Sequence, residues 1–560
     1  MAEETSPLRS VVRALDHRPP LPRERFIVED RPDDEAIPMD VVFVGGGPAG
    51  LAGAIELARL AREADESGEG IGQIEIGVLE KAGQLGEHSL SGAVVNPSAF
   101  RELFPQLSTE DFPFRQPVAK ESVYMLTASR AVRIPTPPTM KNHGNHIASI
   151  CEIVRWLGER AEEMGVNVFP GFPVDSLLVE GSNVIGVRTT PSGLGRDGEP
   201  SGDAMPAVDL TARVTVLSEG TRGPLSQAWL DWQSVPSENP QIFALGVKEL
   251  WEVKKPLDRV VHTMGWPVPG DAFGGSFMYP MSEGLVALGL VVGLDYADAR
   301  FDVHEALQRM KLHPLFREYL EGGEMIEWGA KTIPEGGYYS VPERRHGDGL
   351  VIVGDAAGYV EVSSLKGIHY AMHSGILAAR QIFEALRKGD GSAAALAGYT
   401  EAVDRSVIMK DLKARRNMRL AFKRGFIAGG ASAGLMTLTG GAFPGGKIAV
   451  EEDAADPKRL GPAPEPFVPD GKLTFSKVDA VYKSGNQTRD DIPPHLIVPD
   501  DVGPEAAEMY VHVCPAGVYE RDGDGLVVNA PNCVDCKATD VLGPRWTPRE
   551  GGSGPGYRQM

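Results

Sequence analysis

The stretch Asp40-Val-Val-Phe-Val-Gly-Gly-Gly-Pro-Ala-Gly-Leu-Ala-Gly-Ala-Ile-Glu-Leu-Ala-Arg-Leu-Ala61 decides the fold of this chain. Its first part is a short apolar run that predicts a buried strand, and the part from Pro48 onward has the composition and spacing of a helix. The turn between them satisfies the pattern G-x-G-x-x-G at Gly45, Gly47 and Gly50. Because this turn joins a strand to a helix, it indicates an α/β fold that binds a dinucleotide.

Each of these three glycines has a steric reason to lack a side chain. A side chain at Gly45 would obstruct the tight turn, and one at Gly47 would keep a pyrophosphate away from the helix N-terminus. A side chain at Gly50 would hold the helix and the strand apart. A second strand is predicted to end at Glu80, whose carboxylate is then placed to accept hydrogen bonds from ribose hydroxyls. Since NAD and FAD both use such a turn, the motif leaves the nucleotide open.

A second glycine-containing turn lies far along the chain, in Gly349-Leu-Val-Ile-Val-Gly-Asp-Ala-Ala-Gly358. Here a predicted strand delivers Asp355 between Gly354 and Gly358. The pairing of the two turns resembles that of FAD proteins of the glutathione-reductase and hydroxybenzoate-hydroxylase type. In those families the acid holds the ribityl chain, and the helix that follows directs its positive end at the flavin. The alternative is that Asp355 only caps a helix.

The composition predicts a mostly folded chain of several domains. Its 42% hydrophobic and 24% charged residues fit neither wholesale disorder nor a polytopic membrane protein. The pattern of strands, helices and prolines predicts an irregular leader at 1–38, a nucleotide domain at 39–240 and 340–450, an antiparallel-sheet domain at 241–339, and a linker with a small module at 451–560. The net charge of −21 would repel phosphate backbones, so no nucleic-acid partner is expected.

Three of the four cysteines crowd together near one end of the chain, as Cys514-Pro and Cys533-Val-Asp-Cys536. This arrangement looks ferredoxin-like and predicts an iron–sulfur cluster, which needs four ligands. A further two-residue step reaches Thr539, where a fourth cysteine would be expected. The hypotheses are a [4Fe–4S] cluster with Thr539, Asp540 or solvent as the fourth ligand, a [3Fe–4S] cluster, or an empty remnant.

Zinc offers another interpretation of the same cysteines. His512 with the three clustered cysteines would make a Cys₃His structural zinc site, because the number and softness of the ligands fit. The remaining cysteine, Cys151, is expected to be an apolar filler on a buried helix face.

The segment 409–447 is predicted to contact a membrane. Within it, Phe426–Phe443 carries no charge, although its glycines make it too weak to span a bilayer. Basic residues crowd directly upstream, at Lys410, Lys413, Arg415, Arg416, Arg419, Lys423 and Arg424. A basic strip beside an apolar surface suits a peripheral membrane protein. The alternative is a buried glycine-rich helix pair with a solvated basic face.

Longer passages resemble the electron transfer flavoprotein–ubiquinone oxidoreductase family, over nearly everything from about residue 40 onward. Among them are Leu85-Gly-Glu-His-Ser-Leu-Ser-Gly-Ala93, Val261-His-Thr-Met-Gly-Trp266, Gly274-Gly-Ser-Phe-Met-Tyr279, Leu365-Lys-Gly-Ile-His369 and Cys514-Pro-Ala-Gly-Val-Tyr-Glu520. The resemblance implies an FAD domain, a ubiquinone-binding domain with the antiparallel sheet, and a cluster-bearing ferredoxin-like module. It also implies that Ser91, Gly92 and Gly367 help to bind FAD.

The family resemblance implies a function as well. Electrons arrive from reduced electron transfer flavoprotein, pass through an iron–sulfur centre and FAD, and leave on ubiquinone. The protein is then expected on the inner face of a bacterial cytoplasmic membrane, or on the matrix side of the mitochondrial inner membrane. Two departures stand out, because the family has cysteine at Thr539 and usually Ser or Thr at Ile368. The alternatives are an isoprenoid reductase resembling geranylgeranyl reductases and a flavoprotein with a structural zinc module.

Overall fold

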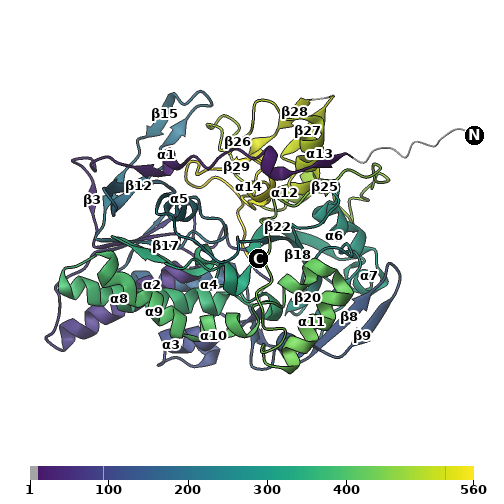
Figure 1. Cartoon of the computed structure of the whole chain (residues 1–560), viewed down its shortest axis with the longest axis horizontal. Helices are drawn as coiled ribbons and strands as arrows, with labels where there is room; N and C mark the ends of the chain where they lie inside the picture. The colour runs from purple at the N-terminus through teal and green to yellow at the C-terminus, as the bar shows by residue number, and fades with distance from the viewer. Residues whose placement is uncertain (1–9, 93, 524) are drawn as a thin grey trace, which may run out of the picture.

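A mostly parallel central sheet organises the first lobe (Figure 1). The computed structural model describes residues 10–92, 94–523 and 525–560. In these ranges six strands form the central sheet, in the order β11 (Asn167–Pro170), β5 (Ile76–Glu80), β4 (Val41–Val44), β17 (Val214–Leu217), β24 (Leu350–Ile352) and β23 (His346–Gly347). Only β23 pairs antiparallel. Every residue of β4 and β17 is buried, which fits a parallel sheet covered on both faces.

Helices cover one face of the central sheet and a smaller sheet lies on the other (Figure 1). The helices are α2 (Pro48–Glu66), α4 (Ile150–Glu163), α8 (Ile368–Lys388) and α9 (Ala393–Arg405). The smaller sheet has the order β2 (Ile27–Val28), β12 (Val174–Glu180), β13 (Asn183–Thr189), β16 (Asp209–Thr211) and β3 (Ile37–Pro38). Helices α2 and α8 touch at Gly53 and Gly375, where a side chain on Gly375 would overlap the carbonyl oxygen of Ala49. The lack of a side chain at both glycines therefore lets the N-terminal halves of the two helices pack closely together.

A large sheet forms the second lobe. Counting only described residues, its seven strands are β22 (Glu324–Pro334), β18 (Phe243–Glu252), β21 (Leu285–Gly293), β20 (Gly274–Ser282), β19 (Val260–Gly265), β8 (Glu121–Leu126) and β9 (Ala131–Ile134). This sheet differs in two ways from the antiparallel sheet predicted within 241–339. The hairpin β8–β9 comes from the first half of the chain, and β8 pairs parallel to β19. Helices α6 (Val303–Lys311) and α7 (Pro314–Leu320) also belong to this lobe.

The C-terminal module follows the linker and packs onto the large sheet. It contains α12 (Lys477–Tyr482), β26 (Leu496–Ile497), α13 (Pro504–Val513), β27 (Tyr519–Asp522), β28 (Gly525–Val528), α14 (Ala538–Leu542) and β29 (Arg545–Trp546). Apolar side chains of the module and of the large sheet share one core, and α12 contacts β22. The module is therefore not a separate body on a flexible tether.

The predicted irregular leader is in fact paired with distant parts of the chain. Residues 1–9 lie outside the described residues. Beyond them β1 (Val11–Val12) pairs with β25 (Lys458–Arg459) of the linker. The side chain of Phe26 is fully buried, and Arg545 Nε donates to the carbonyl oxygen of Pro19 at 2.9 Å. These contacts join residues hundreds of positions apart, which local composition does not reveal, while most side chains of residues 10–38 stay exposed or half-buried.

Shorter elements complete the described fold. They are α1 (Arg23–Phe26), α3 (Ser98–Leu103), α5 (Pro224–Trp232), α10 (Val407–Ala414), α11 (Phe426–Leu438), the sheet of β6 (Val94–Val95), β10 (His146–Ile147) and β7 (Gln116–Pro117), and the pair β14 (Ser192–Leu194) and β15 (Pro200–Met205). Among described residues, no helix has both the length and the apolar character needed to cross a bilayer.

Candidate functional site

The β4–α2 turn has the geometry that its glycines predict. Gly45 has φ +110°, and a Cβ there would lie 2.5 Å from the carbonyl oxygen of Ser218. A side chain on Gly50 would overlap the carbonyl oxygen of Gly45. A Cβ on Gly47 would meet nothing within 4 Å. Gly45 and Gly50 are thus required by packing, whereas Gly47 borders open space at the N-terminus of α2, where backbone N–H groups favour an anion.

Glu80 holds the other side of this turn. Its Oε2 accepts from the N–H of Gly46 at 2.9 Å, and its Oε1 accepts from the N–H of Ala82 at 2.9 Å. The carboxylate is therefore fixed beside the glycines at the end of β5. An ionised carboxylate has further lone pairs, so both oxygens can still accept from ribose hydroxyls.

The second glycine turn touches the first. Gly354 has φ +64°, and a Cβ there would lie 3.0 Å from the Cβ of Ala49 in the first turn of α2. Its N–H donates to Ser374 Oγ of α8 at 2.9 Å. A Cβ on Gly358, φ +81°, would lie 2.7 Å from Gln241 Nε2. The two turns predicted from distant segments thus come together at the starts of α2 and α8.

The carboxylate of Asp355 is free at this junction. It makes no hydrogen bond or ion pair with any residue that the structure describes, so it does not cap a helix. A Cβ on Gly367 would lie 3.9 Å from Asp355 Oδ1, which places Gly367 beside it. Burial raises the pKa of Asp355 to about 6, while the nearby Lys331 acts in the opposite direction. A half-buried acceptor without a donor fits a ligand rich in hydroxyl groups.

Ser91 and Gly92 lie against strands of the large sheet. The carbonyl oxygen of Ser91 accepts from Lys248 Nζ of β18 at 3.0 Å. A Cβ on Gly92 would lie 3.9 Å from the ring of Tyr279 on β20. The hydroxyl of Tyr279 is in turn bonded to His262 Nε2 at 2.6 Å, and both side chains are buried. This loop therefore joins the nucleotide lobe to the face of the large sheet.

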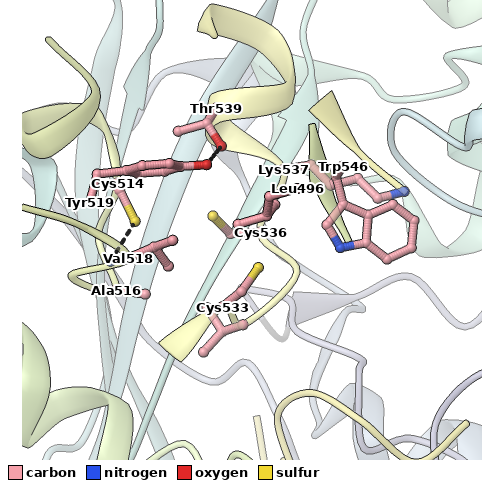
Figure 2. Close-up of a pocket in the computed structure, with 11 residues that line it drawn as sticks. Leu496, Cys514, Ala516, Val518, Tyr519, Cys533, Cys536, Lys537, Thr539 and Trp546 are labelled. Atoms are coloured by element: carbon pink, nitrogen blue, oxygen red, sulfur yellow. Dashed lines mark hydrogen bonds between the residues drawn. The ribbon is translucent and has the colours of Figure 1, made fainter. Parts of the chain in front are cut away.

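The three C-terminal cysteines line one cavity, with their sulfurs facing a common space (Figure 2). Other lining residues are Leu496, Ala516, Val518, Tyr519, Val534, Lys537, Thr539 and Trp546. The N–H of Val518 donates to Cys514 Sγ at 3.5 Å. Burial raises the pKa of all three thiols, that of Cys533 to about 12. The cavity therefore presents three soft ligands in a mostly apolar wall, as an iron–sulfur cluster requires.

The two predicted candidates for the fourth ligand point to different places. Thr539 lines the cavity from the first turn of α14, and its Oγ1 is 3.5 Å from the hydroxyl of Tyr519 (Figure 2). Asp540 does not line the cavity. Its carboxylate forms an ion pair with Arg222 and accepts from the N–H of Trp546 at 3.0 Å. Of the two candidates, only Thr539 faces the cysteines.

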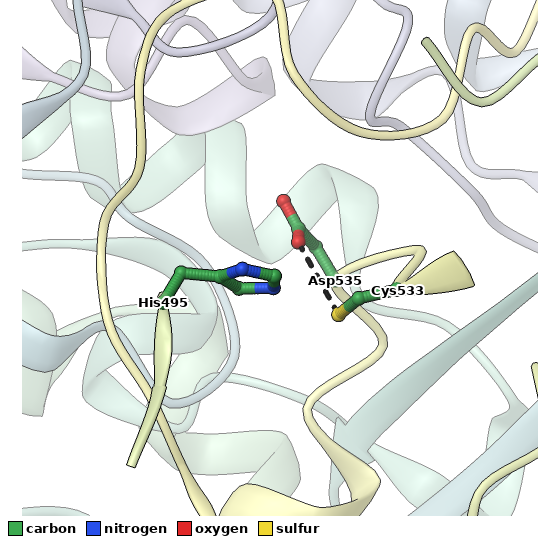
Figure 3. Close-up of side chains that lie close together, drawn as sticks. All are labelled: His495, Cys533 and Asp535. Atoms are coloured by element: carbon green, nitrogen blue, oxygen red, sulfur yellow. Dashed lines mark hydrogen bonds between the residues drawn. The ribbon is translucent and has the colours of Figure 1, made fainter. Parts of the chain in front are cut away.

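The predicted zinc set is not brought together. His512 lies outside the cavity, with Nε2 at 3.4 Å from Glu508. A different histidine, His495, lies with Cys533 and Asp535, and their ligand atoms are all within 4.8 Å of one another (Figure 3). Asp535 is already held by Lys81, by Arg549 at 2.9 Å and by Trp546 Nε1 at 2.9 Å. Sequence reasoning missed His495, because no motif links a single histidine to cysteines so far along the chain.

Strand β22 connects the two candidate sites. Lys331 Nζ donates to the carbonyl oxygen of Asp535 at 3.3 Å, and the N–H of Thr332 donates to that of Cys536 at 3.0 Å. Lys331 also interacts electrostatically with Glu80 and Asp355 of the nucleotide turns. Burial lowers the pKa of its ammonium group to about 8. Sequence reasoning missed Lys331, although a single lysine within the otherwise uncharged run Trp328–Pro334 is a recognisable signal.

Two further predictions concern Cys151 and the membrane segment. Cys151 is fully buried on α4, as expected. The apolar side chains around α11 are exposed, with Ile427 at 87%, Leu438 at 85% and Phe443 at 59%, so a buried helix pair is excluded. Only part of the basic strip is exposed at the surface, because Arg419 and Lys423 turn inward and form ion pairs with Asp295.

Two solved structures have a similar fold. A geranylgeranyl bacteriochlorophyll reductase-like protein from Thermoplasma acidophilum matches with a TM-score of 0.56 and 19% identity, covering 72% of this chain and 92% of that chain. A flavin-dependent brominase matches with a TM-score of 0.50 and 17% identity, covering 72% and 94%. These likenesses concern the fold alone. Together with the glycine turns and the cysteine cavity, they define a two-lobed α/β protein with a cysteine-bearing C-terminal module.

Sequence comparisons give the particular family. Residues 243–333 match a family model described as "ETF-QO, ubiquinone-binding", and residues 471–558 match "Electron transfer flavoprotein-ubiquinone oxidoreductase, 4Fe-4S". The mitochondrial electron transfer flavoprotein–ubiquinone oxidoreductase of Oryza sativa is 38% identical, covering 94% of both chains. The human one is 36% identical, covering 93% of this chain and 89% of its own. The chain belongs to the electron transfer flavoprotein–ubiquinone oxidoreductase family.

Proposed function

We propose that this chain takes electrons from reduced electron transfer flavoprotein and passes them to ubiquinone, with an iron–sulfur cluster and FAD as its redox groups. When bound, the cluster carries single electrons, and FAD converts single-electron input into a two-electron output. The observation that carries the proposal is the course of β22. One strand contacts the cysteine loop through Lys331 and Thr332 and lies beside the charged groups of both glycine turns.

The proposed FAD site uses the two turns in different ways. Gly45, Gly47 and Gly50 open the N-terminus of α2 to the pyrophosphate, and Glu80 accepts from ribose hydroxyls. Asp355 accepts from the ribityl hydroxyls, and Gly354, Gly358 and Gly367 let the backbone approach. Ser91 and Gly92 close the site from the large sheet. The free carboxylate of Asp355 and the open space at Gly47 support this assignment.

The proposed cluster site is the cysteine cavity, with Cys514, Cys533 and Cys536 as ligands. The N–H of Val518 already points at Cys514 Sγ, and such bonds stabilise thiolate ligands. Lys331 lies between this cavity and the flavin turns. Its positive charge would stabilise the reduced form of a redox group on either side of it, which suits a residue between two redox groups.

The proposed domain division follows the predicted ranges. The FAD domain is 39–240 with 340–450, the ubiquinone domain is 241–339, and the cluster module with its linker is 451–560. We add the hairpin β8–β9 to the ubiquinone domain, because it extends the large sheet. The start of the described leader contacts the linker and the module, so we group it with them. Strands β2 and β3 of the leader belong instead with the FAD domain, because they pair with β12 and β16 of its smaller sheet.

The proposed membrane surface is the exposed apolar part of segment 409–447. Ile427, Leu438 and Phe443 would enter the bilayer boundary, beside the exposed bases Lys410, Lys413 and Arg424. We place this surface on the inner face of a bacterial cytoplasmic membrane, or on the matrix side of the mitochondrial inner membrane.

A second cavity supports a route for a lipid-soluble quinone. It is lined by residues that follow the flavin turn, by the loop after β22 and by residues before α11, namely Val360, Glu361, Tyr338, Leu412, Met418 and Arg419 among others. The cavity thus extends from the Asp355 turn toward the apolar surface. This position suits a substrate that arrives from the membrane.

The test is anaerobic turnover with the FAD-loaded chain. Reduced electron transfer flavoprotein should be oxidised only when a short-chain ubiquinone is present, at a rate proportional to the chain. A flavin-loaded preparation without quinone-dependent turnover would refute the proposal. Metal analysis separates it from the zinc alternative, because iron with acid-labile sulfide is expected and stoichiometric zinc is not. The isoprenoid reductase alternative rests only on a shared fold.

A further inference from the structure

We infer that one iron of the cluster in this chain faces the hydroxyl of Thr539 in place of a cysteine thiolate. This iron is therefore bound weakly and can be removed and restored. The inference rests on the proposed function, because it takes the cysteine cavity as the cluster site. It concerns the chain's departure from the pattern of its own family, in which a cysteine stands at this position.

The cavity has sulfur on three sides and hydroxyl groups on the fourth. Cys514, Cys533 and Cys536 supply the three sulfurs (Figure 2). Thr539 Oγ1 and the hydroxyl of Tyr519 line the same cavity and lie 3.5 Å apart, with the Tyr519 ring beside Cys514 (Figure 2). Both residues are buried, with 9% of Thr539 and 2% of Tyr519 exposed. The fourth side of the cavity therefore presents oxygen atoms in a position that excludes most of the solvent.

The other polar residues near the cavity are already committed or turned away. Lys537 Nζ donates to the carbonyl oxygens of Thr221 and Arg222. Asp540 is paired with Arg222 and lies outside the cavity wall. Among described residues, His495 and Asp535 approach Cys533 but do not line the cavity (Figure 3). Within the described part of the chain, no fourth thiol and no imidazole lines the cavity to complete the cluster at Thr539.

The chemistry of the ligands predicts the consequence. Iron in a sulfide cluster is well matched to soft thiolate ligands, whereas a hydroxyl is a harder and weaker ligand for it. Ferricyanide removes one electron from a [4Fe–4S]²⁺ core to give [4Fe–4S]³⁺, and ferricyanide is reduced to ferrocyanide. The oxidised core then separates into [3Fe–4S]⁺ and Fe²⁺, which balances both charge and iron. The corner without thiolate is where the iron should leave.

The experiment compares the wild-type chain with Thr539→Cys, Thr539→Val and Thr539→Ser, all prepared without oxygen. Thr127→Cys, on an exposed loop, is the control for an added thiol far from the cavity. Each sample is treated with ferricyanide, and released iron, remaining sulfide, FAD content and the EPR spectrum are measured. Ferrous iron with a reductant is then added back.

The wild-type chain, Thr539→Ser and Thr127→Cys should lose about one iron per chain and show the EPR signal of an oxidised three-iron cluster. The iron should return on reconstitution. Thr539→Cys should keep all its iron, and Thr539→Val should have lost one iron before treatment. A wild-type cluster that keeps all its iron, or that cannot take up a fourth, would overturn the inference. Wild-type protein and Thr539→Cys that both lack iron and sulfide would instead refute the proposed cluster.

Discussion

At the scale of single residues, two neighbouring glycines should respond differently to the same substitution. Gly50→Ala would force a side chain into the carbonyl oxygen of Gly45, so the chain should lose about 1–3 kcal/mol of unfolding free energy even without FAD. Gly47→Ala meets nothing within 4 Å and should leave the apoprotein as stable as before. It should still weaken FAD binding, by about tenfold or more, or at least ~1.4 kcal/mol. Thermal unfolding and FAD titration of both variants check this, and equal FAD affinity in Gly47→Ala and wild type would contradict it.

Asp355 should make FAD binding depend on pH. Burial raises the pKa of the free carboxyl to about 6, so below about pH 6 it is mostly protonated. Hydroxyl donors of FAD favour the ionised form, so binding releases a proton in that range and the affinity should fall as the pH falls below about 6. The stability of the apoprotein should depend on pH in the opposite direction. The unfolded chain ionises from about pH 4, so this carboxyl should destabilise the apoprotein increasingly between about pH 4 and 6.

FAD titrations from about pH 5 to 8 test this expectation, with Asp355→Asn as the control. The variant should bind FAD more weakly and with a flatter pH profile. A wild-type affinity that does not change with pH would show that the Asp355 carboxyl does not contact the flavin nucleotide.

At the scale of elements, α11 should determine membrane binding. Ile427 and Leu438 are almost fully exposed, and burying each in a bilayer boundary is worth roughly 1.5–3 kcal/mol. Replacing both with Glu should therefore weaken binding to anionic vesicles about a hundredfold or more without unfolding the protein. Vesicle co-sedimentation measures this. Val468→Glu is the control, because Val468 is 83% exposed but lies in the linker. Equal binding by the double variant and wild type would reject this surface.

The sequence predicts some elements better than others, for physical reasons. The turn at Gly45–Gly50 and the turn at Gly354 follow from local sterics, so their motifs predict both the backbone and the neighbours. The hairpin β8–β9 and the leader depend on pairing with strands far away in the chain, and local patterns do not contain that information. The same limit explains why His495 was missed, because its place beside Cys533 depends on how the module packs. Lys331 differs, because its sequence context alone could have revealed it.

At the scale of the whole molecule, the buried ion pair of Arg222 and Asp540 helps to join the FAD-binding region to the cluster module. Arg222 and Asp540 are 10% and 4% exposed. Arg222→Met leaves Asp540 without its closest cation and should reduce the unfolding free energy by about 3–5 kcal/mol. The exposed pair of Arg405 and Glu401 gives the control, because Arg405→Met should cost less than about 1 kcal/mol. Chemical denaturation measures both, and equal effects would contradict the account.

A variant of Asp540 tests whether this residue is structural or a ligand of the cluster. Asp540→Asn should lower stability but leave the iron and sulfide content unchanged, because Asp540 points away from the cysteine cavity. A variant that folds but loses iron would make Asp540 a ligand after all.

The most direct measurement is the cofactor content of a single purified preparation of this chain. We expect about one acid-released FAD per chain, together with iron and acid-labile sulfide, because β22 contacts the cysteine loop and lies beside the charged groups of both glycine turns. A colourless protein that takes up no flavin when incubated with excess FAD would contradict it.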